Sequence, residues 1–436
     1  MRQRIESYFE FTALGTNWRT EILAGVTTFM TMAYIVFVNP SILSDAGMPV
    51  GAVTAATCLS AAFGSFMMGV VARYPIALAP GMGLNAYFAY SVVKGMGLSW
   101  QAALGAVLLS GIAFLLITLL GLRQLILAAV PLELHSAVAA GIGLFIALLG
   151  FRNAGIVIPD PSTTVTLGNL HDPNTLLAIF GLLLAGVLMA WRVPAALLIG
   201  ILATTGVGIV TGVAKWQPMS YHFSDITQTV ARVDVAAFHR FDFIEVVIVL
   251  LFVSLFDNLG TLIAVGKQTG LFTAGNRIPR LNRILFADAS ATMTGALSGT
   301  SPVVSYIESA AGVAAGGRTG ITAVVTGLLF LVAAFAAPVL GVVPVAAVAP
   351  ALIVVGCLMM TAVTDIDWRE PVTALSAFLT MMAIPLTFSI ANGLALGFTA
   401  YTVFRVMRGE FTKLNWLTYV LAALFLARFI FLGKGA

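Results

Sequence analysis

Long apolar stretches, separated by short polar segments, follow one another along nearly the whole chain. A helix needs about 20 apolar residues to cross a bilayer at a rise of about 1.5 Å per residue, and most of these stretches are long enough. The pattern therefore predicts an all-α membrane protein with many spans. The fourteen predicted segments lie near 22–43, 51–71, 76–93, 99–120, 132–150, 174–191, 193–213, 243–266, 282–299, 301–315, 319–338, 340–362, 371–386 and 388–407.

Two regions flank these segments. Residues 1–21 form a lead-in that we expect on the cytoplasmic side. The segment that follows is too long for the apolar core of a signal peptide and lacks a persuasive cleavage site, so we interpret it as the first span. At the other end, residues 413–436 are expected to form a hydrophobic helix that either crosses the membrane or lies at its interface.

Composition supports the membrane assignment. Of the 436 residues, 60% are hydrophobic and only 9% are charged, whereas soluble domains carry about 25% charged residues. The lipid bilayer is therefore an expected partner. The net charge of +4 is spread over loops and forms no basic patch, so we expect no nucleic-acid partner. Cys58 and Cys357 both fall in apolar runs, which gives no indication of a disulfide framework.

The basic residues predict the orientation. With the N-terminus inside, fifteen Lys and Arg residues fall on cytoplasmic segments and five on the other side. Because Lys and Arg are enriched on the cytoplasmic side of membrane proteins, we expect a cytoplasmic N-terminus. We expect a multi-pass protein of the cell's inner (plasma) membrane.

The two halves of the chain resemble each other. The polar loop 214–242, which we expect outside the cytoplasm, separates seven segments from seven. Residues 37–43 (FVNPSIL) align with residues 256–262 (FDNLGTL) at an offset of 219, and Pro80 and Pro302 are 222 residues apart. Because seven is an odd number, the second half must insert upside down relative to the first, as in transporters built from inverted repeats.

Two apolar segments at matching positions are interrupted. Residues 79–87 (APGMGLNAY) carry Asn85, and residues 300–310 (TSPVVSYIESA) carry Glu308. Broken segments in corresponding places of two halves are a pointer to a transporter binding site. Asn85 either caps the half-helix that follows Gly83 or contacts a ligand.

Three carboxyl groups lie inside predicted segments: Asp257, Asp288 and Glu308. A charge at the centre of a membrane helix costs about 2.5–3.5 kcal/mol, and the segments offer no Lys or Arg to pair with these groups. They are either protonated hydrogen-bond partners in helix packing, or groups that face a cavity and bind a polar ligand, a cation or a coupling proton. Tyr306 and Phe256 either pack or stack on a planar ligand.

Other chemistry finds little support. Residues 81–86 (GMGLNA) match a loose dinucleotide-binding pattern but lack the strand–helix–strand context that this pattern requires. We see no metal-ligand motif and no pairing of a nucleophile with a base, so we expect no enzyme, no metal site and no organic cofactor. A substrate-gated channel, an intramembrane enzyme and a sensor remain as alternatives to a transporter.

Four motifs together resemble those of the AzgA-like purine permeases, which belong to the nucleobase–cation symporters of the nucleobase–ascorbate transporter superfamily. The motifs are GVTTFMTMAYI (25–35), LAPGMGLNAYF (78–88), FDNLGT (256–261) and GTSPVVSYIESAAGV (299–313).

The resemblance implies a uracil-permease-like fold of fourteen segments in a 7+7 inverted repeat. Segments 3 and 10 would each be a short strand plus a half-helix, with the strands crossing at mid-membrane. The implied core domain comprises 22–120 and 243–338, and the implied gate domain comprises 132–213 and 340–407. A homodimer through the gate domain and an elevator-like motion of core against gate are further implications.

The resemblance also implies the site. Asp257, Glu308 and Asn85 match substrate-binding positions, and Asp288 matches an aspartate that supports the site. The pair Asp257 and Glu308 favours hypoxanthine and guanine, or adenine, over uracil and xanthine. Proton symport is expected, with Asp257, Glu308 and Asp288 in coupling or supporting roles and Na⁺ as the alternative ion.

The substrate chemistry is consistent with this site. Two carboxylates can accept from the ring N–H groups of hypoxanthine or guanine, while the Asn85 amide and backbone N–H groups meet the exocyclic oxygen. The alternative is an adenine-preferring permease, whose substrate asks for an acceptor at that exocyclic position. Another nucleobase transporter, or a small-anion transporter or channel, is a more distant alternative.

Overall fold

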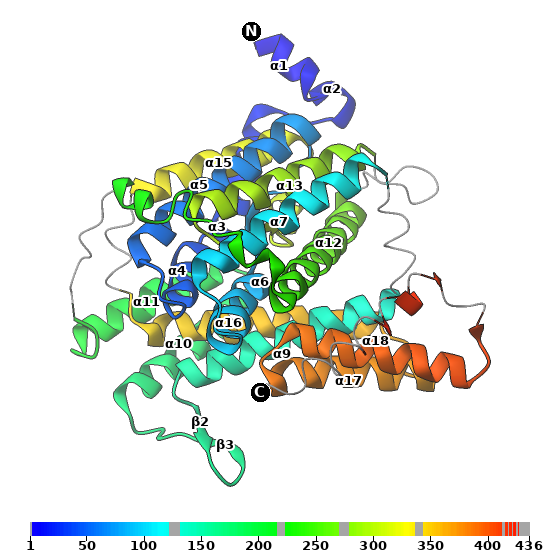
Figure 1. Cartoon of the computed structure of the whole chain (residues 1–436). Coiled ribbons are helices and arrows are strands. Elements are labelled where there is room, and N and C mark those ends of the chain that lie inside the picture. Colours follow the sequence, from blue (N-terminus) through cyan, green and yellow to red (C-terminus); the bar gives the residue numbers. More distant parts are fainter. Residues whose placement is uncertain are drawn as a thin grey trace. The chain divides into compact units, whose positions relative to one another are not determined.

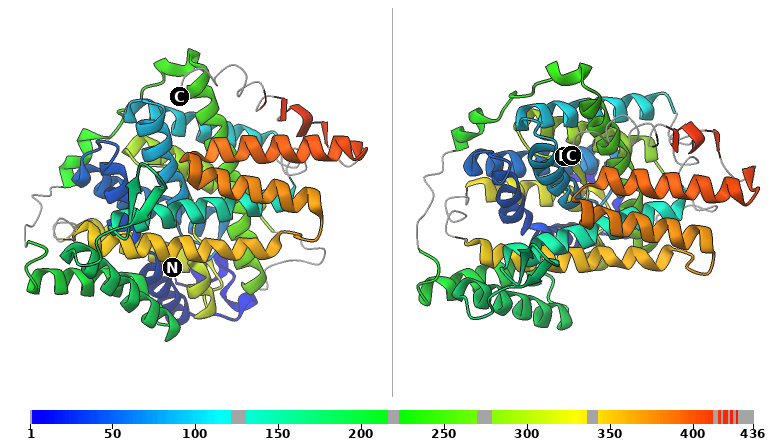
Figure 2. Two further views of the ribbon diagram at one scale, coloured as in Figure 1. Left: turned by 90° about the horizontal axis from the view of Figure 1, so that it is seen from below. Right: turned by 60° about the horizontal axis from the view of Figure 1, so that its bottom comes forward.

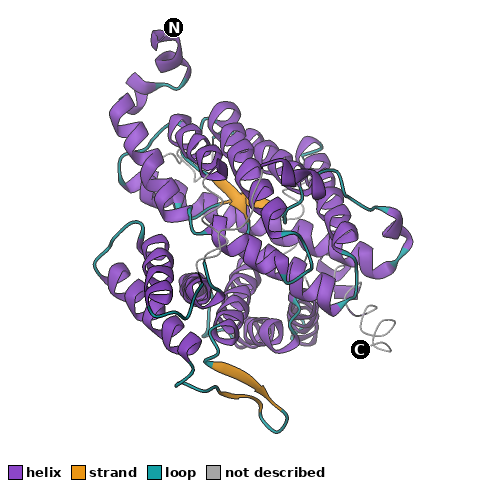
Figure 3. Cartoon of the chain, turned by 90° about the vertical axis from the view of Figure 1, so that its left-hand side faces the viewer, coloured by secondary structure: helices purple, strands orange, loops and turns teal. Residues whose placement is uncertain are grey.

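Helices dominate the structure (Figures 1 and 3). The computed structural model describes residues 2–121, 131–215, 223–269, 279–335, 343–411 and parts of 415–426. Its α-helices are α1 Arg2–Tyr8, α2 Phe11–Leu14, α3 Trp18–Met32, α4 Ile35–Ser44, α5 Val50–Met67, α6 Met82–Ala86, α7 Trp100–Leu119, α9 Leu132–Asn153, α10 Pro173–Ala190, α11 Ala196–Val210, α12 Phe241–Thr269, α13 Leu281–Ser298, α14 Ser309–Ala314, α15 Gly320–Phe335, α16 Val345–Met359, α17 Pro371–Thr387 and α18 Ile390–Met407. Two π-helices, Met68–Ala72 and Tyr87–Gly95, continue α5 and α6, and 3₁₀ turns lie at Phe223–Gln228, Ala236–His239 and Met360–Asp365.

The observed elements follow the predicted segments closely. Each predicted segment coincides with a described helix or, for segments 3 and 10, with a strand and short helix. Within the described residues, eight helices are long and apolar enough to cross a membrane, and three shorter apolar helices accompany them. The all-helical membrane fold is therefore confirmed, while the number of fourteen crossings stays a prediction. The predicted helix in 413–436 lies largely outside the described residues.

The chain divides into two compact units. One comprises Met1–Leu116 and Gly150–Leu352, and the other comprises Ile117–Leu149 and Ile353–Ala436. The first unit contains the predicted core except residues 117–120, and in addition residues 150–213 and 340–352, which we assigned to the gate. The core and gate boundaries stay a prediction.

The two interrupted segments meet as strands in the first unit. β1 (Leu78–Pro80) and β4 (Val303–Ser305) form an antiparallel pair in which Leu78 lies opposite Ser305 and Pro80 opposite Val303. Two further backbone bonds extend the pair, from Gly81 N–H to the Pro302 carbonyl (2.9 Å) and from Tyr306 N–H to the Ala77 carbonyl (3.0 Å). A proline interrupts each segment, and because proline lacks an N–H it cannot continue the hydrogen bonds of a helix. The backbone groups that lose their helical partners form hydrogen bonds across the strand pair instead. Both short helices, α6 and α14, begin just beyond these strands.

Contacts at the two ends of the first unit agree with the inverted topology. Glu10 pairs with Arg73 and with Arg280, so the lead-in, the end of segment 2 and the start of segment 9 share one end. At the other end, the Thr229 hydroxyl of the 214–242 loop donates to the carbonyl of Ser298, the last residue of α13 (2.9 Å). With a single crossing by segment 8, this grouping agrees with an odd number of crossings before the loop, which an inverted second half would need.

Close helix packing in this unit depends on glycine. α15 packs against both α3 and α5. A Cβ placed on Gly320 would lie 1.9 Å from the Gly69 carbonyl oxygen, and one placed on Gly25 would lie 2.7 Å from the Thr322 carbonyl oxygen. Small residues let membrane helices approach at backbone distance, so these glycines are needed for space rather than for flexibility.

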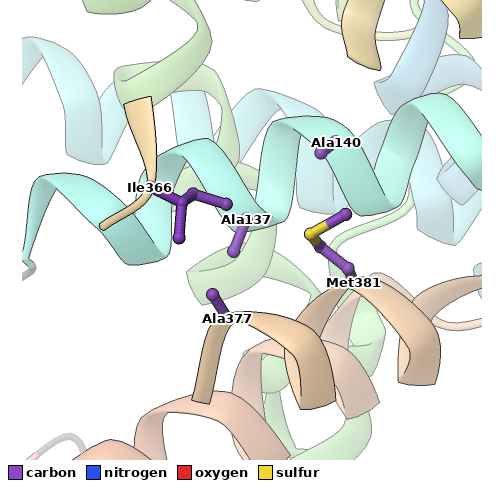
Figure 4. Packing of buried hydrophobic residues seen from close by; sticks show 5 residues of the cluster. All are labelled: Ala137, Ala140, Ile366, Ala377 and Met381. Atoms are coloured by element: carbon purple, nitrogen blue, oxygen red, sulfur yellow. The ribbon is translucent and has the colours of Figure 1, made fainter. Parts of the chain in front are cut away.

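The second unit has an apolar core of its own (Figure 4). Its buried cluster combines Ala137 and Ala140 of α9 with Ile366, Ala377 and Met381. α17 and α18 run side by side (Figure 2), and the turn between them places Phe388 at φ 50°.

One element was not predicted. β2 (Val157–Asp160) and β3 (Thr164–Leu167) form a hairpin between α9 and α10 (Figure 3). Asp160 orders its turn by accepting hydrogen bonds from Ser162 and Thr163. These bonds, of which that from the Ser162 hydroxyl is the strongest, lower the pKa of Asp160 from 3.8 to about 2.

Candidate functional site

The first unit brings the predicted site residues onto elements that pack together. α12 carries Phe256 and Asp257, and it packs against α6, which carries Asn85. α12 also packs against β4 and α14, on either side of Tyr306 and Glu308. Residues from three different predicted segments therefore lie around the β1–β4 pair.

Asp257 and Glu308 lie on elements that pack together. Asp257 is on α12, which packs against α14, and Glu308 is the residue directly before α14. Within the described part of the chain, no Lys or Arg forms an ion pair with Asp257, Asp288 or Glu308. Like charges in an environment of low dielectric repel strongly, so two ionised carboxylates at this site would repel each other with no described cation to offset them.

Tyr34 fixes the position of Glu308. The Tyr34 hydroxyl donates to Glu308 Oε1 at 2.6 Å, and the Thr31 hydroxyl donates to the Glu308 backbone carbonyl at 3.4 Å. Tyr34 is buried and lies at the break between α3 and α4, so segment 1 is also interrupted beside the site. In the sequence, Tyr34 is only an aromatic residue in an apolar segment, and such a residue usually just packs.

Tyr306 ties the two broken segments together. Its hydroxyl donates to the Pro80 carbonyl at 2.5 Å, an acceptor that the following helix leaves free. Phe256 packs beside Phe252, with ring centroids 5.8 Å apart. Stacking of either ring on a ligand stays a prediction.

Asp288 supports the end of β4. Its Oδ1 accepts from the Ser305 hydroxyl at 2.8 Å, and Asn258 Oδ1 accepts from the Ser305 backbone N–H at 2.7 Å. Both residues are fully buried. Asp288 Oδ2 and Asn258 Nδ2 have no hydrogen-bond partner among the described residues. This arrangement is consistent with the supporting role that we expected of Asp288.

The side chain of Asn85 is held by that of Asn39. Gly81, not Asn85, occupies the N-cap of α6, and no side chain caps this helix. The capping alternative for Asn85 is therefore wrong. Instead, Asn85 Nδ2 donates to Asn39 Oδ1 at 3.0 Å, and both asparagines are fully buried. Asn39 was visible only as part of the repeated motif at residues 37–43.

The described residues contain no group of three or more His, Cys, Asp or Glu side chains that could hold a metal ion. The chemistry of the site thus consists of carboxylate, amide and hydroxyl groups, which suit a neutral polar ligand or a proton.

Membrane-length helices, two interrupted segments paired through strands, and carboxyl groups beside them that form no ion pair among the described residues are together typical of a membrane transporter. The chain belongs to the permease family whose model (Xan_ur_permease) matches residues 19–396.

Curated relatives align over almost the whole chain. The putative permease MJ0326 of Methanocaldococcus jannaschii is 48% identical over 98% of this chain and 99% of its own length. The guanine/hypoxanthine permease PbuG of Bacillus subtilis is 44% identical over 98% of this chain and its full length. The adenine permease AdeP of Escherichia coli is 42% identical over 98% of this chain and 96% of its own length.

Solved structures share the fold. The transmembrane domain of a cyanobacterial bicarbonate transporter, BicA, superposes with a TM-score of 0.61 at 16% identity, covering 87% of this chain and 96% of that domain. The murine anion transporter Slc26a9 in its inward-facing state gives a TM-score of 0.67 at 11% identity, covering 90% of this chain and 69% of that one. The solved structures confirm the predicted fold, and the family and the curated relatives confirm the predicted transporter rather than an enzyme.

Proposed function

We propose that this permease imports purine nucleobases by proton symport. The observation that carries the proposal is the placement of Asp257 and Glu308. Asp257 lies on α12, which packs against α14, and Glu308 directly precedes α14; neither forms an ion pair with a described cation. Purine bases present ring N–H groups, and carboxylates are their natural acceptors. The names of the curated relatives, an adenine permease and a guanine/hypoxanthine permease, support the same substrate class.

The repulsion between the ionised carboxylates of Asp257 and Glu308 would couple the binding of a base to the binding of a proton. Two carboxylates that repel each other gain stability when one of them takes up a proton. A neutral base then binds between one acceptor and one neutral carboxyl group without leaving a second buried negative charge. Binding of base and binding of proton therefore favour each other, and such coupling is reciprocal.

The proposal also covers the membrane, the orientation and the movement that transport requires. We place the protein in the plasma membrane with a cytoplasmic N-terminus, in accordance with the distribution of Lys and Arg. The predicted core carries the site, and its movement against the predicted gate would expose the site to each side in turn. In a homodimer formed through the gate segments, the gate would stay in place while the core moves. Crosslinks that join core to gate should abolish uptake.

The test is uptake of labelled hypoxanthine, guanine and adenine by cells that lack their own purine permeases. We expect saturable uptake that falls by at least about tenfold with a protonophore. Asp257→Asn and Glu308→Gln should each lower uptake by a similar factor, because loss of a hydrogen bond to a charged group costs about 1.5–3 kcal/mol.

Asp242→Asn provides a matched control on the same helix. Asp242 lies at the start of α12 and pairs with Arg240 at the surface (2.6 Å), so its charge is far from the site and its loss should leave uptake unchanged. Absence of saturable uptake of any purine would refute the proposed substrate class.

A further inference from the structure

We propose that Asn39 turns the amide of Asn85 so that its carbonyl oxygen serves the substrate, and that the site thereby prefers purines with an exocyclic amine. This inference rests on the proposed function and deepens it. It assigns a specificity-determining role to Asn39, which positions Asn85 without itself touching the substrate.

A chain of donors and acceptors fixes the orientation of both amides. The Thr57 hydroxyl donates to the Val53 carbonyl at 2.7 Å, so its oxygen faces Asn39 as an acceptor. Asn39 Nδ2 donates to that oxygen at 2.8 Å, and also to the Thr300 hydroxyl at 2.8 Å. Asn39 must therefore present its carbonyl oxygen to Asn85.

Asn85 completes the chain. Its amide nitrogen donates to Asn39 Oδ1 at 3.0 Å, and the Ser301 hydroxyl approaches the same oxygen at 3.5 Å. The Asn85 carbonyl oxygen is then the last atom in this series of hydrogen bonds. It is buried and accepts no hydrogen bond from the described residues. An unpaired buried acceptor is costly, so a donor from a ligand fits it.

The opposite orientation of the two amide groups is unfavourable. If Asn85 offered its amide nitrogen to the ligand, Asn39 would have to turn its own nitrogen toward Asn85 and its oxygen toward Thr57. The Thr57 hydroxyl would then leave the Val53 carbonyl in order to donate to Asn39. The hydrogen bond from Thr57 to the backbone of α5 therefore selects the orientation in which the Asn85 carbonyl oxygen is left unpaired for the ligand.

The free acceptor belongs to the candidate site. α4, which carries Asn39, packs against α6, and α6 packs against α12, which carries Asp257. Three acceptors are thus available to a ligand: the Asp257 and Glu308 carboxylates and the Asn85 carbonyl oxygen. This proposal differs from the expectation that the Asn85 amide donates to an exocyclic oxygen, because the Asn85 amide nitrogen already donates to Asn39. Adenine and guanine each carry an amine that can donate to it, whereas hypoxanthine has none.

The test uses two pairs of bases that differ only by one amine. Adenine is compared with unsubstituted purine, and guanine with hypoxanthine, as inhibitors of labelled adenine and labelled guanine uptake. In the parent protein we expect the amine-bearing base of at least one pair to bind about tenfold or more tightly, because its partner leaves the acceptor unpaired. The pair that discriminates identifies the amine at the 6-position or at the 2-position.

Variants of Thr57 test the role of the chain. Thr57→Val removes the anchor without touching the site, and we expect the ratio of inhibition constants within the discriminating pair to fall several-fold toward one. Thr57→Ser keeps a hydroxyl and should keep the ratio. Thr54→Val is the matched control, because among the described residues the Thr54 hydroxyl donates to the Val50 carbonyl of its own helix (2.8 Å).

The outcomes separate this inference from the proposed function. Purine uptake in which neither pair shows a difference would overturn the amine preference and leave the purine permease intact. Uptake of no purine at all would overturn both. If Thr57→Val does not reach the membrane, the two pairs measured on the parent protein and on Thr57→Ser still decide the preference.

Discussion

Glu21→Ala should destabilise the first unit strongly. Glu21 is fully buried near the start of α3. One carboxylate oxygen accepts from the Thr16 hydroxyl (2.8 Å) and the Arg318 N–H (3.0 Å). The other accepts from the Thr322 hydroxyl (2.6 Å) and the Thr319 N–H (3.3 Å). This one side chain therefore holds the start of α15 and the loop after α14 against α3.

The magnitude follows from the donors that alanine would leave behind. Hydroxyl groups can turn toward other acceptors, but the two backbone N–H groups at the start of α15 cannot. Each buried polar group that loses its partner costs about 1–3 kcal/mol, so we expect a loss of at least about 2 and up to about 6 kcal/mol. Glu21→Gln keeps the volume and one carbonyl oxygen, and it should cost about half as much, because its amide nitrogen faces donors.

The assay is a denaturant titration of the purified protein in detergent micelles, followed by intrinsic fluorescence. Asp242→Ala is the control, since the surface ion pair that it removes is expected to contribute less than about 1 kcal/mol. A Glu21→Ala protein within about 0.5 kcal/mol of the parent would refute the reasoning.

Two further predictions concern the site and its packing. Tyr34→Phe should raise the KM for purine uptake about three- to tenfold, because Glu308 loses the hydrogen bond that positions it; an unchanged KM would count against this role. Gly312→Ala should cost about 1–3 kcal/mol in the same titration and abolish uptake, because its Cβ would lie 2.6 Å from the Ala24 carbonyl oxygen. Gly206→Ala, which meets no atom within 4 Å, should preserve both stability and uptake.

The helical elements could be predicted from the sequence because the membrane imposes one pattern on them. Twenty apolar residues between polar loops admit few alternatives, and the prolines at 80 and 302 mark where the pattern must fail. The backbone groups freed at these breaks need partners, and the β1–β4 pair supplies them. The hairpin at 157–167 was not predicted, because it lies outside the apolar pattern and its residues are largely exposed.

The polar contacts could be predicted only in part. Asp257, Asp288 and Glu308 are conspicuous because a carboxylate inside an apolar segment needs a reason. Glu21 lies beside a polar lead-in, so it looked like an ordinary residue at a helix start, and all of its partners except Thr16 lie about 300 residues further along the chain. Asn39 is similar: only the fold shows that its amide joins two other segments.

The most direct test of the account is accumulation of labelled guanine or adenine by proteoliposomes that contain only this protein. With an acidic exterior and a neutral interior, we expect uptake above the external concentration, and a protonophore should dissipate it. Asp257→Asn proteoliposomes should not accumulate either base, and Asp242→Asn proteoliposomes should behave as the parent. Equal uptake with and without the pH gradient would contradict proton symport, and equal accumulation by Asp257→Asn would contradict the proposed site.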